Sequence, residues 1–230
     1  MIKAILLDFN GVIINDEPLQ MKAYQEILKG EGVDLTEEQY YSCMGMNDRT
    51  FVESIAKLAG KEFSPEKNEN LIAQKTQKWR GMIENEIPLF PGVENFIRKM
   101  EKEFALGIVS MARREEIEYI LEKTELLDCF SAIISAEDVS TCKPDPQCYL
   151  AGFSKVDAAR TRNGHNPMTH SECLVIEDSP QGIMAGKRAG LKTLGIINTV
   201  SAESLREAGA DATAIDLDDW FPDSIRRVFV

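Results

Sequence analysis

Five short apolar runs, separated by helical patterns, indicate an α/β protein. The runs occupy residues 2–8, 104–110, 131–135, 173–178 and 191–197. Apolar runs of this length, without polar alternation, are typical of strands that are covered on both faces. Apolar residues recur at helical spacing between them, over residues 93–102, 113–127, 146–153 and 181–189. Strands that alternate with helices predict right-handed βαβ units and a doubly wound parallel sheet.

One long stretch, from residue 16 to about residue 86, breaks this alternation. It contains no convincing strand, but helical patterns cover residues 19–28, 37–43, 50–58 and 69–83. The turn-rich segment PLFPG, residues 88–92, then returns the chain to the alternating pattern. We therefore expect a core domain of residues 1–15 and 87–230. An all-helical cap domain of residues 16–86 is inserted into it, over the carboxyl end of the first strand.

Composition and charge narrow the classes of function. The 230 residues are 43% hydrophobic and 28% charged, which is ordinary for a globular protein. The net charge of −12 repels nucleic acid backbones and anionic membranes, so we expect neither as a partner. No apolar stretch approaches the length of a membrane span. The five cysteines are odd in number and show no CxxC spacing, which favours reduced thiols in a cytoplasmic protein. We expect a monomer.

Polar residues follow the predicted strands at the edge where ligands bind in open parallel sheets. These residues are Asp8, Ser110, Lys143, Glu177 and Asp178. Mg²⁺ is usually held by one or two carboxylates, which Asp8 and Asp178 can supply. A carboxylate can also attack phosphorus and form an acyl phosphate. Lys143 would neutralise the charge of the phosphoryl group, and the Ser110 hydroxyl would hydrogen-bond one of its oxygens.

These motifs resemble those of the haloacid dehalogenase (HAD)-like hydrolase superfamily over essentially the whole chain. The family pattern stands here as DFNGV, GIVSMA, CKPDP and VIEDSPQGI, in that order. The helical insertion resembles the cap of the β-phosphoglucomutase-like subgroup. The resemblance implies a Rossmann-like core with an all-helical cap, and a Mg²⁺-dependent phosphatase acting on a small phosphorylated metabolite. A phosphomutase and a catalytically weak protein that binds a phosphorylated ligand remain the alternatives.

The resemblance also assigns roles to residues. It implies Asp8 as the nucleophile, with Asn10, Ser110 and Lys143 as further catalytic positions. It implies that Mg²⁺ is bound by Asp8, the backbone carbonyl of Asn10, and Asp178. Glu177 is equally suited to bind the metal or to support its ligands. The substrate-binding positions would be Gly11, Met111, Ala112 and, in the cap, Arg49.

The chain departs from the family pattern at position 10. There the family has a second aspartate, which protonates the leaving oxygen and later activates water, but here the residue is Asn10. Loss of a positioned general acid–base typically costs about 10²–10⁴-fold in rate. The protein could act on esters with good leaving groups, take the proton from a cap residue, be an engineered variant, or lack turnover. Slow deamidation of Asn10 is a minor hypothesis. Nearby, Asn15 stands where Asp is usual and Asp16 where Ser is usual.

Overall fold

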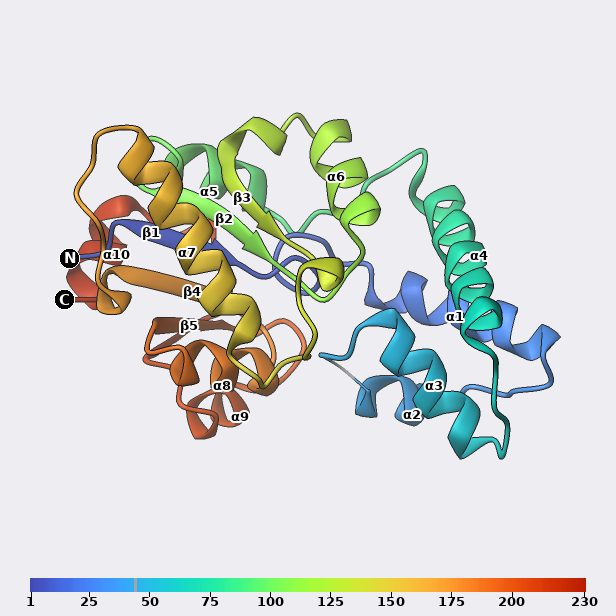
Figure 1. The fold of residues 1–230 in the computed structure, drawn as a ribbon. Coiled ribbons are helices and arrows are strands. Elements are labelled where there is room, and N and C mark those ends of the chain that lie inside the picture. Colours follow the sequence, from blue (N-terminus) through green and yellow to red (C-terminus); the bar gives the residue numbers. More distant parts are fainter. Residues whose placement is uncertain (44) are drawn as a thin grey trace.

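A parallel sheet forms the centre of the larger part of the molecule (Figure 1). The computed structural model describes residues 1–43 and 45–230. Within these residues the sheet has six strands in the order β3-β2-β1-β4-β5-β6. The strands are β1 (Ala4–Leu7), β2 (Ala105–Val109), β3 (Phe130–Ile134), β4 (Cys173–Glu177), β5 (Lys192–Ile196) and β6 (Ala212–Ala214). All pairings are parallel, and this order is that of a Rossmann-like fold, as predicted.

Helices cover both faces of the sheet because its central strand is apolar on both sides. All four residues of β1 are buried, and they alternate between two apolar clusters. Ile5 and Leu7 face the cluster that contains α5 (Val93–Met100), α6 (Arg114–Lys123) and α10 (Pro222–Val228). The opposite face carries α7 (Gln147–Arg162) and α8 (Pro180–Arg188). The remaining core elements are α9 (Ala202–Glu207) and short 3-10 helices at Leu127–Cys129, Ala136–Asp138 and His170–Glu172.

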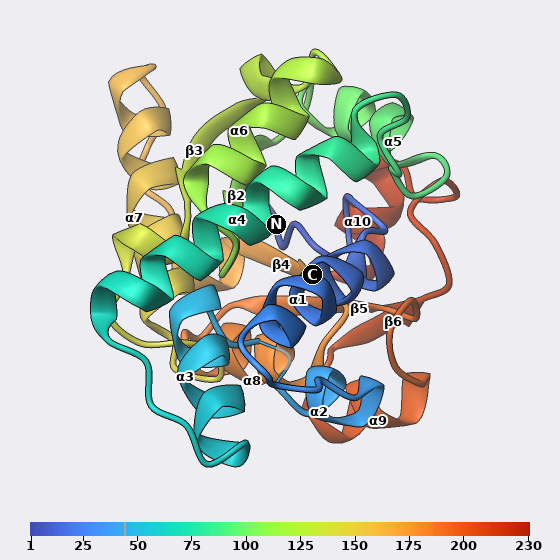
Figure 2. The ribbon, with the colours of Figure 1, turned by 90° about the vertical axis from the view of Figure 1, so that its right-hand side faces the viewer.

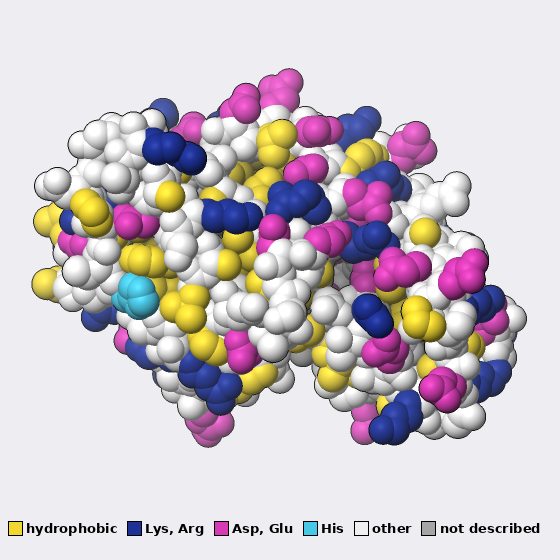
Figure 3. All heavy atoms as spheres, viewed as in Figure 1, with side chains coloured by type: hydrophobic (Ala, Val, Ile, Leu, Met, Phe, Trp, Pro, Cys, Tyr) yellow, Lys and Arg dark blue, Asp and Glu magenta, His cyan; other side chains and the backbone are white. Residues whose placement is uncertain are grey.

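Four helices form a separate part at the carboxyl edge of the sheet (Figures 1 and 2). They are α1 (Glu17–Gly30), α2 (Glu37–Ser42), α3 (Asp48–Leu58) and α4 (Pro65–Ile83). Their apolar faces meet in a cluster of their own, which includes Tyr24, Leu28, Phe51 and Leu71. On the face drawn in Figure 3, a notch lies between this part and the rest of the molecule. The helices lie within the proposed cap domain, 16–86; Met44 is outside the described residues.

The strand register brings the predicted site residues to one edge. Leu7 pairs with Ile108 on one side and with Ile176 on the other. The residues that follow these three positions therefore leave the sheet at the same level. Asp8 and the carboxyl ends of β2 and β4 are therefore neighbours. They lie at the edge of the sheet that faces the cap helices.

The sequence analysis did not predict the three short elements near the end of the chain, α9, β6 and α10. It also predicted α7 to end too early. Strand β6 has three half-buried residues, ATA, and α9 and α10 have only six and seven residues. Such short elements carry too few apolar positions for a periodic signal. Helix α7 continues to Arg162, beyond the predicted end at residue 153, because Val156 and Ala159 still pack against the core. Of the helices among residues 1–43 and 45–230, none is long and apolar enough to cross a membrane.

Candidate active site

A small cavity of about 110 Å³ lies between the carboxyl edge of the sheet and the cap helices. Seven of the predicted site residues line it: Asp8, Asn10, Ser110, Met111, Ala112, Lys143 and Asp178. Glu177 lies behind this wall and contacts Lys143, and Gly11 leaves room for the carboxylate of Asp178. Loops directly after the strands position most of these groups, so the rigid sheet fixes their spacing.

Lys143 connects the buried acidic residues on the side of the cavity that the core domain forms. Its buried ammonium group lies 2.9 Å from Asp8 Oδ1 and 2.6 Å from Glu177 Oε1. It also donates to the carbonyl oxygen of Val109 at 3.3 Å. Burial by itself lowers the pKa of Lys143, but the charges of the two carboxylates outweigh burial and raise it above its ordinary value. Lys143 is therefore charged at physiological pH and holds Asp8 in place.

Asp8 lies at the end of β1 and is nearly buried. Burial and the charge of Glu177 raise the pKa of Asp8 to about 7, although Lys143 opposes them. A carboxylate must be ionised to attack phosphorus. An additional cation beside Asp8 would favour this ionised form. The site therefore suits a nucleophilic Asp8 best when a metal ion or another positive group is close.

Glu177 is fully buried, and protein donors occupy both of its oxygens. Oε1 accepts hydrogen bonds from Lys143 and from the hydroxyl of Tyr149, at 2.6 and 2.7 Å. Oε2 accepts from the Ser179 hydroxyl at 3.0 Å and from two backbone N–H groups. A Cβ at position 182 would lie 1.8 Å from Glu177 Oε1, so only Gly182 fits the first turn of α8. These contacts suit a residue that supports Lys143, and direct metal binding by Glu177 stays a prediction.

The carboxylates at this end have the chemistry and spacing of a Mg²⁺ site. One ligand oxygen each of Asp8, Glu177 and Asp178 lies within 4.8 Å of the others. Oxygen ligands from carboxylates are what Mg²⁺ prefers. Gly11, at φ +78°, lets Asp178 approach, because a Cβ there would be 2.0 Å from Asp178 Oδ2. The donor set therefore fits a hard divalent cation, whose charge would oppose the raised pKa of Asp178 that burial and Glu177 cause.

Two residues that follow β5, Asn198 and Thr199, also contact this group of residues. The sequence analysis did not predict them. The Thr199 hydroxyl donates to Asp178 Oδ2, and the Asn198 amide donates to the carbonyl oxygen of Gly11 at 2.7 Å. Both follow a strand in the same way as Asp8 and Ser110 do. The rule that ligand sites lie beyond strand ends could therefore have found them.

The predicted catalytic residue Ser110 lies beside two of the predicted substrate-binding positions, Met111 and Ala112, whereas a third, Arg49, lies apart from them. Ser110 is buried, and its Oγ accepts a hydrogen bond from the Ala112 N–H at 3.1 Å. This turn lines the cavity together with Met111. Arg49, at the start of α3, is exposed and pairs with Glu53 at 3.1 Å, beside a different hollow. A contact between Arg49 and a substrate stays a prediction and requires the side chain to move.

Asn10 is hydrogen-bonded to Asp16, so the two main departures from the family pattern contact each other. Asn10 Nδ2 donates to Asp16 Oδ1 at 2.9 Å. Asp16 is completely buried and also accepts from Gln20 Nε2 and Trp79 Nε1, at 2.9 and 2.8 Å. Burial raises the pKa of Asp16, and these three donors oppose the rise. An amide suits position 10 here, because an aspartate would place two carboxylates together in a buried site.

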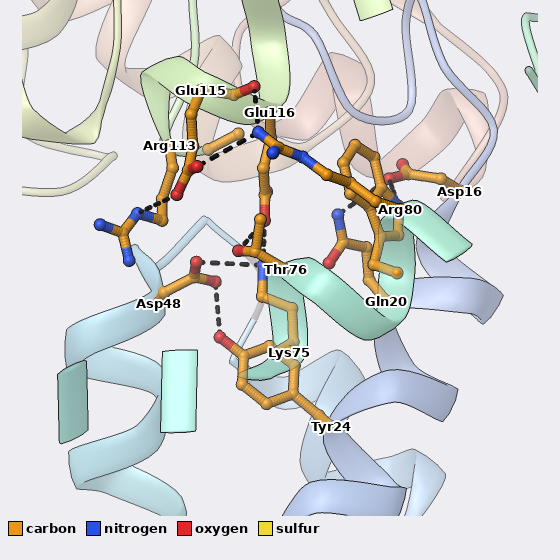
Figure 4. Close-up of polar contacts among 12 residues, drawn as sticks. Asp16, Gln20, Tyr24, Asp48, Lys75, Thr76, Arg80, Arg113, Glu115 and Glu116 are labelled. Carbon is orange, nitrogen blue, oxygen red and sulfur yellow. Dashed lines mark hydrogen bonds and ion pairs between the residues drawn. The ribbon is translucent and has the colours of Figure 1, made fainter. Parts of the chain in front are cut away.

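The cap side of the cavity contains a second buried lysine (Figure 4). Lys75 of α4 lies 2.9 Å from Glu116 Oε1 of α6 and 3.0 Å from Asp48 Oδ2 of α3. Thr76 donates to the same Glu116 oxygen at 2.6 Å, and the Tyr24 hydroxyl donates to Asp48 at 2.5 Å. The sequence analysis missed this cluster. A lysine on the apolar face of a predicted helix, between Ile72 and Trp79, was the available signal.

Comparisons with known proteins show which family and which fold the chain resembles. The family model described as haloacid dehalogenase-like hydrolase matches residues 5–196. Hexitol phosphatase B of Escherichia coli is 26% identical over 197 residues, covering 84% of this chain and 82% of that protein. Protein SUPPRESSOR OF QUENCHING 1, chloroplastic, of Arabidopsis thaliana is 27% identical over 94% of this chain, which spans a fifth (20%) of that longer protein.

A solved structure shows the same fold. The β-phosphoglucomutase of Clostridium difficile superimposes with a TM-score of 0.84, at 20% identity, over 100% of this chain and 97% of that one.

Proposed function

The chain belongs to the haloacid dehalogenase-like hydrolase family, and from this premise we propose a Mg²⁺-dependent phosphatase that acts on a small phosphorylated carbohydrate through Asp8. The main support is the buried Lys143 that holds Asp8 at 2.9 Å, beside carboxylates spaced for a metal ion. The relative named hexitol phosphatase B suggests the class of substrate.

The first step we propose is transfer of the phosphoryl group to Asp8. A carboxylate oxygen forms a bond to phosphorus while the bond from phosphorus to the ester oxygen breaks. Lys143, the Ser110 hydroxyl and nearby backbone N–H groups stabilise the negative charge on the phosphoryl oxygens. Asp8, Asp178 and the backbone carbonyl of Asn10 would hold Mg²⁺, which when bound supplies further positive charge there.

The second step returns Asp8 to its starting form. Water adds to phosphorus, loses a proton, and the bond between phosphorus and Asp8 breaks, which releases inorganic phosphate. The departing ester oxygen needs a proton in the first step, and the water must lose one in the second. The amide of Asn10 can do neither, so another group must serve or the reaction must depend on good leaving groups.

Glu17 is the carboxyl that we propose for this proton transfer. It lines the same cavity as Asp8 and Asn10, at the point where the chain enters the cap. The Tyr40 hydroxyl donates to its Oε2 at 2.7 Å. Burial, with the charges of Asp16 and Asp8, raises the pKa of Glu17 to about 7, while Tyr40 and Lys75 oppose the rise. A group with a pKa near the working pH can both give and accept a proton efficiently.

The test is phosphate release from hexose and hexitol monophosphates by the full chain, with Mg²⁺ or with EDTA. We expect release that requires Mg²⁺ and disappears in Asp8→Asn. Release that persists in Asp8→Asn would contradict the proposed nucleophile. If the chain is inactive while Asn10→Asp is active, the protein is better described as one that binds a phosphorylated ligand without turning it over.

A further inference from the structure

The cap end of the cavity carries more acidic than basic groups. Glu17, Asp48 and Glu116 line it, and Lys75 is the only lysine or arginine that the described cap-end lining contains. Lys75 and Glu116 are 1% and 2% exposed, so water screens their charges poorly. A negatively charged group that entered this end would therefore meet the carboxylates of Asp48 and Glu116, the partly ionised Glu17 and one lysine.

Lys75 is not available as a phosphate-binding cation. Its ammonium group is held by Glu116 and Asp48, at 2.9 and 3.0 Å, from above and from the left in the view of Figure 4. A phosphate could bind Lys75 only if it displaced one carboxylate, which would leave a buried charge without a partner. Loss of one partner from a buried ion pair is strongly unfavourable.

The arginines near this end are also paired with carboxylates. Arg113 lies within 3.9 Å of Glu69, Glu115 and Glu137, and it borders a neighbouring hollow rather than the cavity. Arg80 pairs with Glu115 at 3.2 Å. Second phosphates are usually bound by arginine or lysine groups free to form several hydrogen bonds. The described lining of the cavity contains no such group, since Arg49 lies outside it, beside the neighbouring hollow and paired with Glu53 at 3.1 Å.

An acceptor without a partner faces the same space. Gln20 is 6% exposed and lines the cavity, and its Nε2 donates to Asp16. Its Oε1 is buried and has no hydrogen-bond partner within the protein. A buried polar atom left without a partner is costly, so a ligand atom that donates a hydrogen bond would be favoured here.

We infer that the cap end selects monophosphate esters whose far end donates hydrogen bonds to Gln20, Asp48 and Glu116, and that it rejects a second phosphate. Hydroxyl groups and an ammonium group share this chemistry. The inference rests on the proposed phosphatase function and names its substrate class. It also distinguishes the protein from a mutase, because a mutase of the β-phosphoglucomutase type must accommodate a bisphosphate intermediate.

The experiment compares kcat/KM for four esters with the full chain and Mg²⁺. They are glucitol 6-phosphate, glucosamine 6-phosphate, propyl phosphate and fructose 1,6-bisphosphate. We expect both sugar-derived monophosphates to exceed propyl phosphate and to exceed the bisphosphate by about 100-fold, since like charges that face each other cost several kcal/mol. A higher value for glucosamine 6-phosphate identifies the ammonium group as the preferred donor, and a higher value for glucitol 6-phosphate identifies hydroxyl groups.

Variants link this preference to the cap-end carboxylates. Asp48→Asn removes one negative charge but keeps the shape, so we expect the preference over the bisphosphate to shrink about tenfold, mainly through KM. Glu116→Gln serves as a second variant of the same kind. Glu26→Gln removes a carboxylate from the exposed face of the cap and should leave the preference unchanged.

Two results would overturn the inference while leaving the phosphatase proposal intact. One is hydrolysis of the bisphosphate as efficiently as of the sugar-derived monophosphates. The other is an unchanged preference in both Asp48→Asn and Glu116→Gln. Failure of the phosphatase proposal itself looks different, because no ester in the set, including propyl phosphate, would then lose a phosphoryl group in an Asp8-dependent way.

Discussion

Two buried lysines, one at each end of the cavity, have nearly the same surroundings. Lys143 lies 2.9 Å from Asp8 and 2.6 Å from Glu177. Lys75 lies 3.0 Å from Asp48 and 2.9 Å from Glu116. In both clusters the carboxylates keep a buried ammonium group charged and raise its pKa against the effect of burial.

The two clusters differ in the elements that supply them. Asp8 and Glu177 end neighbouring strands of one sheet, so the Lys143 cluster belongs to a single rigid unit. Lys75 and Asp48 come from cap helices, whereas Glu116 comes from α6 of the core. Movement of the cap away from the core would separate Lys75 from Glu116 and leave the Lys143 cluster intact. Similar contacts can therefore position a nucleophile in one place and join two parts of a protein in another.

The largest expected effect is on turnover at the core end. Asp8→Asn should reduce kcat on any ester that the chain hydrolyses by about 10⁴-fold or more, since it removes the nucleophile. Lys75→Met should reduce it far less, because Lys75 lies at the other end of the cavity, away from Asp8 and the reacting phosphoryl group. Phosphate release measured side by side checks this. Equal losses in the two variants would show that the ends of the cavity do not have separate roles.

The second prediction compares how much the Lys143 cluster and the Lys75 cluster each contribute to the free energy of unfolding. Lys143→Met leaves two buried carboxylates without their cation, so we expect a loss of about 3–5 kcal/mol in the free energy of unfolding. Lys75→Met should cost less, about 1–3 kcal/mol, because opening of the cap can expose Asp48 and Glu116 to water. Denaturant titration of both variants gives the comparison. If Lys75→Met lowered the free energy of unfolding more than Lys143→Met does, opening of the cap would not be what exposes Asp48 and Glu116 to water.

A smaller effect tests the pair formed by Asn10 and Asp16. Asn10→Asp places two carboxylates in one buried contact and should destabilise the protein. Asp16→Ser in the same chain should remove that conflict, with a coupling energy of about 1–3 kcal/mol in a double-mutant cycle. Thermal unfolding and phosphate release of the single and double variants measure it. Strict additivity would mean that the contact between positions 10 and 16 has no energetic role.

The pH dependence of turnover sharpens the role of Glu17. Because its pKa is raised to about 7, Glu17 is protonated below that pH and loses its proton above it. For propyl phosphate, whose leaving oxygen needs a proton, we expect kcat/KM to fall about tenfold per pH unit well above pH 7. p-Nitrophenyl phosphate needs no acid and should show no such fall. Glu17→Gln should remove the difference between the two profiles, and a difference that persists would exclude Glu17.

The smallest effect concerns Mg²⁺ and the core end alone. Without metal, the pKa of Asp8 is raised from 3.8 to about 7, so its contribution to stability falls as the pH rises across that range. Mg²⁺ binds the ionised form and should offset this loss. We therefore expect Mg²⁺ to raise the Tm by a few degrees at pH 8 and by less at pH 5.5. An equal rise at both pH values, or the same rise in Asp8→Asn, would contradict binding at Asp8.

The sequence predicted the core end well for a simple reason. Asp8 and Ser110 each follow an apolar strand, and Asp178 follows β4, so rules about parallel sheets place all three at one edge. The cap end gave weaker signals. Lys75 and Thr76 lie on the buried face of α4, but periodicity shows only that a face is buried and does not name its partner. Thr199 and Asn198 were accessible to the strand-end rule and were overlooked.

By itself, the sequence determined the α/β class, the helical insertion and the residues at the strand ends, because these depend on local apolar patterns and on chain order. Only the tertiary structure brought Glu116 to Lys75, Asp16 to Asn10 and Glu177 to both Lys143 and Tyr149. Asn10 and Asp16 lie only six residues apart, in the loop between β1 and α1. The other partners are separated along the chain by helical segments whose relative placement depends on packing between side chains of different elements. That packing decides which buried charges are paired, and it therefore decides what the far end of the cavity can bind.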